Sequence, residues 1–218
     1  RSSKTLENYN HYLRRFKDFL GEDIEPKNIS LQKVNNYRMF LNRFIDDNGG
    51  TLGIKTQTFH LIALRSFLKY LTKNDIRTLA PEKIELAKIP ERTIEVISRE
   101  ELDRIFAAVD KAKGQGRRDM AILKTLYSTG LRVSELASLN RDQVDLKRRE
   151  FMVRGKGKKP RIVFLSKEAA EEISTYIKMR VDNYDPLFVN SGKGIKEDIM
   201  DGEKRRLSRV SIENIVRK

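Results

Sequence analysis

The sequence has no cysteine, only two histidines, and no long apolar run. Without cysteine the chain can form neither a disulfide bond nor a thiolate metal site, which fits a reducing cytosol. No apolar run approaches the roughly 18 residues of a membrane span. The polar start RSSKTLENYN also differs from a signal peptide. We therefore expect a soluble, globular protein of a bacterial or archaeal cytoplasm.

The chain has fewer acidic residues than basic ones. The chain carries 45 Lys and Arg against 31 Asp and Glu, a formal charge of +14. This excess points to an extended anionic partner such as nucleic acid, with an acidic membrane surface as the weaker alternative. Most single basic residues only solvate a surface, so the summed charge is better evidence than any one position. With 218 residues, 39% of them apolar, the chain can form one large or two modest domains.

Apolar residues at three- and four-residue spacing predict three helices within residues 1–73. The three stripes are Leu6, Tyr9, Leu13, Phe16 and Leu20; Val34, Tyr37, Leu41 and Phe44; and Leu61, Leu64, Leu68 and Leu71. Ser30 is placed to cap the second helix. The third helix is expected to be the most buried, with Lys55, Arg65 and Lys69 on its polar flanks. This part should form a small helical domain that presents cations beside its core.

Helical spacing lapses over residues 74–97, where two prolines interrupt the chain, and this predicts an interdomain linker. Ser98 and Glu101 then form a capping-box pattern, which indicates that a second domain begins with a helix. A later helix ends at Gly130, a residue suited to the left-handed position after a helix. Arg132 therefore lies at a tight corner between two helices.

Two short β-type runs, FMVR and RIVFL, are separated by GKGKKP, which predicts a hairpin with a cationic tip. Residues 147–161 contain eight Lys and Arg and a single acid, Glu150. An amphipathic helix, SKEAAEEISTYIKMR, follows, and RRLSRVSIENIVRK begins another. The predicted fold is therefore mainly α with a small antiparallel β-sheet, an α+β class.

The position of Arg132 suits it to phosphate chemistry. A corner residue has its backbone held from both sides, so its guanidinium can be aimed at one phosphate. The planar fork of donors matches two non-bridging oxygens, on which charge develops in the transition state. Glu135, three residues on, is placed to brace the fork. For an isolated Arg-x-x-Glu pair, a surface salt bridge is the commoner explanation.

The residues around this pair carry a family resemblance. TGLRVSEL closely resembles the first arginine box of the tyrosine recombinases, the phage integrase and Xer family of DNA strand-exchange enzymes. TLENYNHYLRRFKDFL and ALRSFLKYL resemble helices of the family's core-binding domain, ISREELDRI resembles its entry into the catalytic domain, and VRGKGKKPRIVFLS resembles its β-hairpin. The resemblance implies a helical, SAM-like core-binding domain over residues 1–75, a linker over 76–97 and part of the catalytic domain over 98–218.

The resemblance also implies residue roles. Arg132 matches the first catalytic arginine, which steadies the scissile phosphate, and Glu135 matches the acid that supports it. Lys156 matches the hairpin lysine that protonates the leaving 5′ oxygen, a role that suits an ammonium. Lys158 and Lys159 are close enough to confuse that assignment, but phosphate-backbone contact is the favoured role for both. The complete set of expected DNA contacts is Lys55, Arg65, Lys69, Arg141, Arg154, Lys158, Lys159, Arg161 and Arg209.

Later elements of the family pattern have no counterpart in the sequence. These are the His-x-x-Arg box, the His or Trp after it, and the tyrosine nucleophile. His11 and His60 lie in the amino-terminal helices, where core or surface roles are expected, and Tyr127, Tyr176 and Tyr184 do not fit the nucleophile's position. We therefore expect a chain shortened at its carboxy-terminal end that binds double-stranded DNA and cannot cleave it.

The resemblance implies a reaction without metal, ATP or other cofactor. A tyrosine attacks a phosphodiester, a 3′-phosphotyrosine forms, and a 5′ hydroxyl reverses the step. Family members place two protomers on a site and four in a synapse, whereas this chain is expected to be a monomer in solution. Three alternatives remain: a non-catalytic DNA-binding regulator derived from an integrase; an RNA-binding protein, although no RRM-type aromatic pattern is present; and a P-loop NTPase, suggested only by the incomplete motif SGKG.

Overall fold

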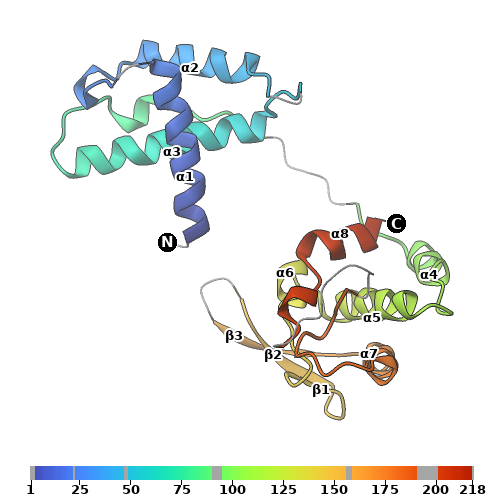
Figure 1. The fold of residues 1–218 in the computed structure, drawn as a ribbon. Helices are drawn as coiled ribbons and strands as arrows, with labels where there is room; N and C mark the ends of the chain where they lie inside the picture. Colours follow the sequence, from blue (N-terminus) through green and yellow to red (C-terminus); the bar gives the residue numbers. More distant parts are fainter. Residues whose placement is uncertain are drawn as a thin grey trace. The chain divides into compact units, whose positions relative to one another are not determined.

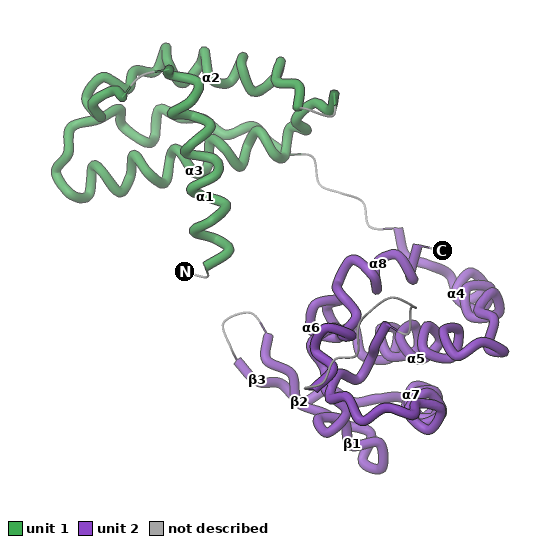
Figure 2. Tube along the Cα trace, in the orientation of Figure 1, with its two compact units in different colours: residues 1–94 green, residues 95–218 purple. Residues whose placement is uncertain are grey.

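The computed structural model describes residues 3–21, 23–46, 49–89, 95–155, 159–190 and 201–217. The chain divides into two compact units, residues 1–94 (unit 1) and 95–218 (unit 2), coloured separately in Figure 2. The described residues are mostly helical, with one small antiparallel sheet in unit 2 (Figure 1). The predicted fold class is confirmed. Among these residues we find no helix that is both long and apolar enough to span a bilayer.

Unit 1 is built from three helices and two short 3-10 turns. They are α1 Ser3–Leu20, η1 Pro26–Asn28, α2 Leu31–Arg43, α3 Ile54–Lys73 and η2 Pro81–Lys83. The Ser30 hydroxyl accepts the N–H of Lys33 at 3.3 Å, which confirms the predicted cap of α2. The core consists of Phe16, Ile29, Val34, Tyr37, Leu41, Leu61, Leu64, Leu68, Leu71 and Ile84. Members of all three predicted apolar stripes therefore meet in one core, to which α3 contributes the most side chains, whereas Leu6 near the start of α1 is 58% exposed.

The segment after α3 stays attached to unit 1. Ile84 is completely buried in the core, and the Thr78 hydroxyl donates to the carbonyl of Pro26 at 2.9 Å. The linker predicted for residues 76–97 therefore overlaps unit 1, and the division between the units falls after Ile94. The overlap arises because an irregular segment can bury apolar side chains without the periodic spacing that marks a helix.

Unit 2 places helices around a three-stranded sheet. Its elements are α4 Arg99–Ala107, α5 Gly114–Thr129, α6 Val133–Ala137, β1 Val144–Asp145, β2 Glu150–Arg154, β3 Pro160–Phe164, α7 Lys167–Met179, η3 Glu203–Arg205 and α8 Arg209–Arg217. The strands pair antiparallel in the order β1-β2-β3, and Phe151 pairs with Val163. The β2–β3 hairpin was predicted. Strand β1 was not, because two residues are too few to show alternation.

Two local signals fix the helix ends that matter most in unit 2. The Ser98 hydroxyl accepts the N–H of Glu101 at 3.2 Å, and the Glu101 carboxylate accepts the N–H of Ser98 at 2.8 Å. The predicted capping box at the start of α4 is confirmed. Helix α5 ends at Gly130, whose φ of 60° lies in the left-handed region, also as predicted. This turn sends the chain directly into the corner that holds Arg132.

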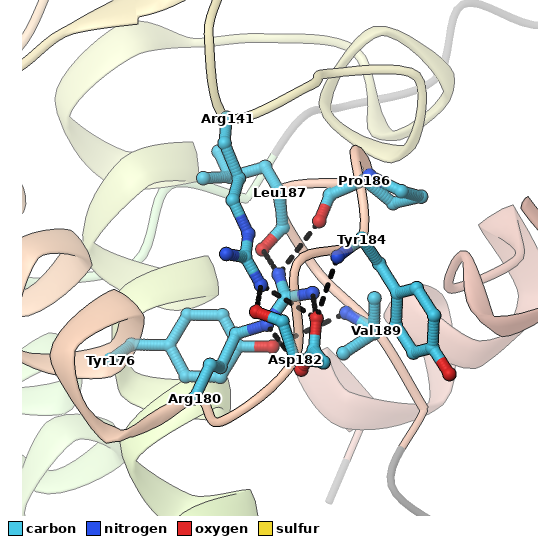
Figure 3. A network of polar contacts seen from close by, with 8 residues as sticks. All are labelled: Arg141, Tyr176, Arg180, Asp182, Tyr184, Pro186, Leu187 and Val189. Atoms are coloured by element: carbon cyan, nitrogen blue, oxygen red, sulfur yellow. Dashed lines mark hydrogen bonds and ion pairs between the residues drawn. The ribbon is translucent and has the colours of Figure 1, made fainter. Parts of the chain in front are cut away.

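A partly buried polar network ties the loop after α7 to the loop after α6 (Figure 3). The Arg180 side chain is only 5% exposed and donates to the carbonyls of Pro186 at 2.7 Å and Leu187 at 3.0 Å. Asp182 forms ion pairs with both Arg180 and Arg141, the latter at 2.6 Å. One carboxylate thus pairs with two cations, and its loss would leave both without an ionic partner in this network.

Candidate functional site

Arg132 lies where the sequence predicted, between the left-handed Gly130 and the first residue of α6. Its main-chain N–H donates to Oε2 of Glu135 at 2.9 Å, and its Nη1 donates to Oε1 at 3.0 Å. The Arg132 side chain is nevertheless 64% exposed. The residue is therefore held at its backbone and at one guanidinium nitrogen, while most of its side chain is open to a ligand.

Glu135 is the buried member of the pair, with a side chain only 9% exposed. Its carboxylate also accepts Nη1 of Arg161 at 3.0 Å and Nη2 at 2.8 Å. The hydrogen bonds from Arg161 lower the pKa of Glu135 to about 2, and those from Arg132 add to the effect against the opposing influence of burial. Glu135 is therefore an anion near neutral pH, and it holds two arginines.

Arg161 comes from β3 and was predicted to contact DNA. In the structure its guanidinium makes a bidentate pair with Glu135, which raises the pKa of Arg161. Bidentate pairs of this kind are among the stronger and more directional ion pairs in proteins. The sequence analysis missed this pairing because the two residues are 26 positions apart.

The hairpin that carries the predicted general acid closes beside this carboxylate. The N–H of Gly155 donates to the carbonyl of Lys159 at 3.1 Å, which joins the two ends of the tip. Lys159 is exposed, as a phosphate contact requires. Lys156 and Lys158 lie outside the described residues, so their roles remain predictions.

The predicted DNA contacts of unit 1 lie on one helix. At 3.6 residues per turn and 1.5 Å per residue, Lys55, Arg65 and Lys69 fall within an arc of about 80° and along about 21 Å of α3. Lys55 and Lys69 are exposed, and Arg65 is half-buried. The three cations therefore form a row suited to following a nucleic-acid backbone.

The remaining predicted contacts of unit 2 differ in their surroundings. Arg154 is exposed at the end of β2, and Arg209 is exposed on α8, where it pairs with Glu213 at 3.3 Å. The Arg141 side chain is only 22% exposed and belongs to the internal network of Figure 3, where burial lowers its pKa. Its partner Asp182 lies 41 positions away, so no local pattern in the sequence revealed it.

Arg206 is a supporting residue that the sequence analysis did not single out. Its Nη1 donates to the carbonyls of Ala137 at 3.1 Å and Leu139 at 3.0 Å, and its Nη2 donates to Asn140 at 2.6 Å. Helix ends leave carbonyl groups without helical partners, and a cation is a favourable partner for them. Arg206 thus stabilises the carboxy-terminal end of α6, the short helix that carries Glu135.

Several tyrosines and histidines of the described residues are held by packing within their own unit. Tyr37 and Tyr176 are buried in the cores of units 1 and 2, and burial raises the pKa of both. Tyr127 packs edge-on against Phe106, with ring centres 6.1 Å apart. His60 is buried, as expected for a core role, and burial lowers its pKa. Within the described part of the chain, no three His, Asp or Glu residues are grouped as metal ligands.

The cluster presents an exposed arginine, fixed by an ionised carboxylate, next to a cationic hairpin. Such an arrangement offers oriented donors and positive charge to an oxyanion, and a chain with a formal charge of +14 concentrates polyanions near it. The site in unit 2 therefore offers donors that are suited to phosphate oxygens.

Comparison with known proteins identifies the family of the chain. Residues 95–218 match the phage integrase family, and residues 1–75 match the phage integrase N-terminal SAM-like domain. Tyrosine recombinase XerC of Pediococcus pentosaceus is 31% identical over 179 residues, covering 81% of this chain and 58% of the relative. XerC of Thermodesulfovibrio yellowstonii is 32% identical over 211 residues, covering 90% of this chain and 67% of the relative.

A solved structure shows the same fold. A lambda integrase dimer bound to a COC′ core site aligns with a TM-score of 0.68, covering 100% of this chain and 57% of that chain at 15% identity. Because the family model covers residues 95–218, more than half of the chain, and XerC relatives share about a third of its residues, the chain belongs to the phage integrase family, the tyrosine recombinases, and it is Xer-like. It spans just over half of the length of the Pediococcus relative that it matches.

Proposed function

We propose that this chain binds duplex DNA in site-specific recombination, in which DNA is cut and rejoined through a 3′-phosphotyrosine intermediate. The observation that carries the proposal is the mounting of Arg132, whose backbone and guanidinium are both bound by the buried carboxylate of Glu135. An arginine held in this way loses little additional freedom when it binds a phosphate. Membership of the phage integrase family supplies the reaction class.

In the proposed reaction, the guanidinium of Arg132 binds non-bridging oxygens of the phosphate that is cut. A tyrosine oxygen forms a bond to phosphorus, and the bond from phosphorus to the 5′ oxygen breaks. The ammonium of Lys156 donates a proton to that leaving oxygen. The freed 5′ hydroxyl of the same or another strand later attacks the phosphotyrosine, which releases the tyrosine and rejoins the DNA. We propose no metal or organic cofactor for these steps.

The DNA-binding part of this proposal is tested by salt titration of a fluorescent duplex. Because each contacted phosphate releases counterions, we expect binding to weaken by about a thousandfold or more between about 50 and 200 mM salt if six phosphates are contacted. Double-stranded RNA of the same sequence serves as competitor. A flat salt titration, or RNA that competes as well as DNA, would contradict the proposal.

We further propose that the 218-residue chain does not form the covalent intermediate by itself. The sequence has no counterpart of the family's tyrosine box, and Tyr37 and Tyr176 are buried in hydrophobic cores. A nicked duplex, from which the cut strand end diffuses away, traps any covalent product. We expect no protein–DNA adduct on a denaturing gel, and an adduct would refute this part of the proposal.

The assembly state is a separate proposal. We propose that the free chain is a monomer, that two copies occupy one DNA site, and that the synapsed complex contains four. Sedimentation velocity of the chain alone and with a duplex distinguishes these states. A stable dimer in the absence of DNA would contradict the first part.

The runner-up function is a DNA-binding regulator derived from an integrase. A regulator of this kind would have the same cationic surface, but it would need only the positive charge of Arg132. Replacement of Arg132 by Lys would then leave DNA binding unchanged, whereas the recombinase proposal requires the planar fork of the guanidinium.

A further inference from the structure

Glu135 connects two parts of unit 2 that are distant in the sequence. Its two carboxylate oxygens bind Arg132, at the start of α6, and Arg161, near the start of β3 in the hairpin. The two pairs share Oε1, which lies 3.0 Å from Nη1 of each arginine. A movement of the hairpin would therefore shift Arg161 relative to Glu135. Because Glu135 is also the partner of Arg132, the orientation of Arg132 would change as well.

Gly155 shows that the hairpin is closely fitted around this pair. A Cβ atom at this position would lie 2.9 Å from Nη1 of Arg161 and 3.9 Å from Oε1 of Glu135. The backbone of Gly155 does not adopt the left-handed conformation. A methyl group there would require a shift of the guanidinium nitrogen that binds Glu135. Lys156, the proposed general acid, follows Gly155 directly.

Much of the positive charge of Arg161 is compensated by an ion pair within the protein. Its two terminal nitrogens both face the Glu135 carboxylate, and its side chain is 39% exposed, compared with 64% for Arg132. A cation that is already neutralised by a bidentate partner releases few counterions when DNA binds. Arg161 therefore differs physically from an exposed hairpin cation such as Arg154.

We propose that Arg161 is a positioning residue for the recombination site, rather than a DNA contact. It locks the β2–β3 hairpin to Glu135, and through this shared carboxylate it holds the guanidinium of Arg132 toward one phosphate. Gly155 leaves room beside the arginine nitrogen that takes part in this lock. The inference rests on the proposed function and adds the residues that set the geometry of its site.

The test uses a duplex that the chain itself selects from a random pool, with single phosphates replaced by neutral methylphosphonates. In the wild type, one replacement should weaken binding most, and Arg132→Ala should remove that sensitivity. Arg161→Gln should reduce the sensitivity at this same phosphate by about fivefold, the size expected for the net contribution of one intramolecular hydrogen bond, because Arg161 acts on Arg132 only through Glu135. It should leave the slope of binding against salt unchanged.

The Gly155→Ala variant distinguishes an effect of the position of the Arg161 guanidinium from an effect of its charge. It adds one methyl group beside Nη1 of Arg161 and removes no charge, so we expect it to reduce the sensitivity at the same phosphate in the same direction. Arg154→Gln is the matched control on the neighbouring strand. It should lower the salt slope by about 0.9, the value for one lost phosphate contact, and leave the Arg132 phosphate as sensitive as before.

A second readout needs no DNA. The carboxyl of Glu135, followed by NMR, should titrate at about 2 in the wild type. The pKa should rise toward its usual range in Arg161→Gln and stay low in Arg154→Gln. If Arg161→Gln does not fold, as judged by thermal unfolding, Gly155→Ala and Arg161→Lys decide the question.

Two results would overturn the inference while leaving DNA binding intact. One is a salt slope that falls by about 0.9 in Arg161→Gln, together with lost sensitivity at a different phosphate, which identifies a direct contact. The other is a Gly155→Ala variant that behaves as the wild type in both readouts. Failure of the wild-type chain to bind any duplex would instead refute the proposed function itself.

Discussion

The carboxylate of Glu135 binds Arg132 twice, through the main-chain N–H at 2.9 Å and through the guanidinium at 3.0 Å. One acidic side chain thus satisfies a backbone donor at the start of α6 and orients the side chain of the residue that precedes the helix. The free N–H groups at a helix start need such partners, and an acid there is also favoured by the helix dipole. Loss of Glu135 should therefore affect folding and phosphate binding together.

Arg132→Ala and Arg132→Lys should both weaken duplex binding. The loss of charge-assisted hydrogen bonds to a phosphate corresponds to about 10- to 100-fold in affinity, and lysine cannot present the planar fork. Fluorescence anisotropy with a labelled duplex measures the change. Arg99→Ala, which removes an exposed arginine paired with Asp103 on α4, should change the affinity by less than about threefold. Full affinity in Arg132→Lys would favour a role for charge alone.

Glu135→Gln should make the free energy of unfolding less dependent on acid pH. The folded pKa of Glu135 is about 2, below its usual 4.5, so its stabilisation is present above about pH 4.5 and is lost as the pH falls toward 2. A shift of this size corresponds to at most about 3.5 kcal/mol. Denaturant titrations of both proteins at several pH values should show a difference at pH 6 that shrinks toward pH 2. A constant difference would argue against the low pKa.

Asp182→Ala should lower the free energy of unfolding by about 3 kcal/mol, because it leaves two arginines without their shared partner in a mostly buried network. Urea titration followed by circular dichroism measures the loss. Asp185→Ala, three residues on at an exposed position, is the matched control and should cost less than about 0.5 kcal/mol. Equal effects of the two changes would show that the network in Figure 3 contributes little.

Arg141→Gln should act on folding rather than on DNA binding. The Arg141 guanidinium donates to the side chain of Asp182 at 2.6 Å and to its carbonyl at 3.0 Å, so its removal should cost about 1–3 kcal/mol of stability. The slope of duplex affinity against salt should stay the same. A slope that falls by about 0.9 would instead support the DNA contact that the sequence suggested for this residue.

Gly130→Ala should lower stability by about 1 kcal/mol without any steric clash. Gly130 has a φ of 60°, and a Cβ atom there would meet nothing within 4 Å, so the cost lies in the backbone alone. Gly114→Ala is the matched control at the first residue of α5, where space is also open and the backbone is helical. Alanine should stabilise that position by about 0.4–1 kcal/mol. Thermal unfolding of the two variants should therefore show shifts of opposite sign.

Much of the fold could be predicted because its signals are local. Ser30 and the Ser98–Glu101 pair cap helices through residues three positions away, and Gly130 ends α5 through its own backbone freedom. The apolar stripes of unit 1 likewise predicted which faces meet in the core. The segment around Ile84 was assigned to a linker because its burial depends on contacts with a distant core, which leave no periodic pattern.

The predictability of the site likewise depends on how far apart the interacting residues lie in the sequence. Arg132 and Glu135 are three positions apart, so their pairing could be predicted from the sequence. The partners of Arg161 and Arg141 lie 26 and 41 positions away, and both residues were assigned to DNA from their charge alone. Net charge indicates a polyanionic partner for the chain, whereas it does not show which cations are already neutralised inside the fold.

The most direct test of the central claim is a structure of the chain bound to the duplex that it selects. The account predicts that the guanidinium of Arg132 lies within hydrogen-bond distance of the non-bridging oxygens of one phosphate, while Glu135 still holds both Arg132 and Arg161. A complex in which Arg132 faces solvent, or in which Glu135 has released Arg161 to the DNA backbone, would contradict it.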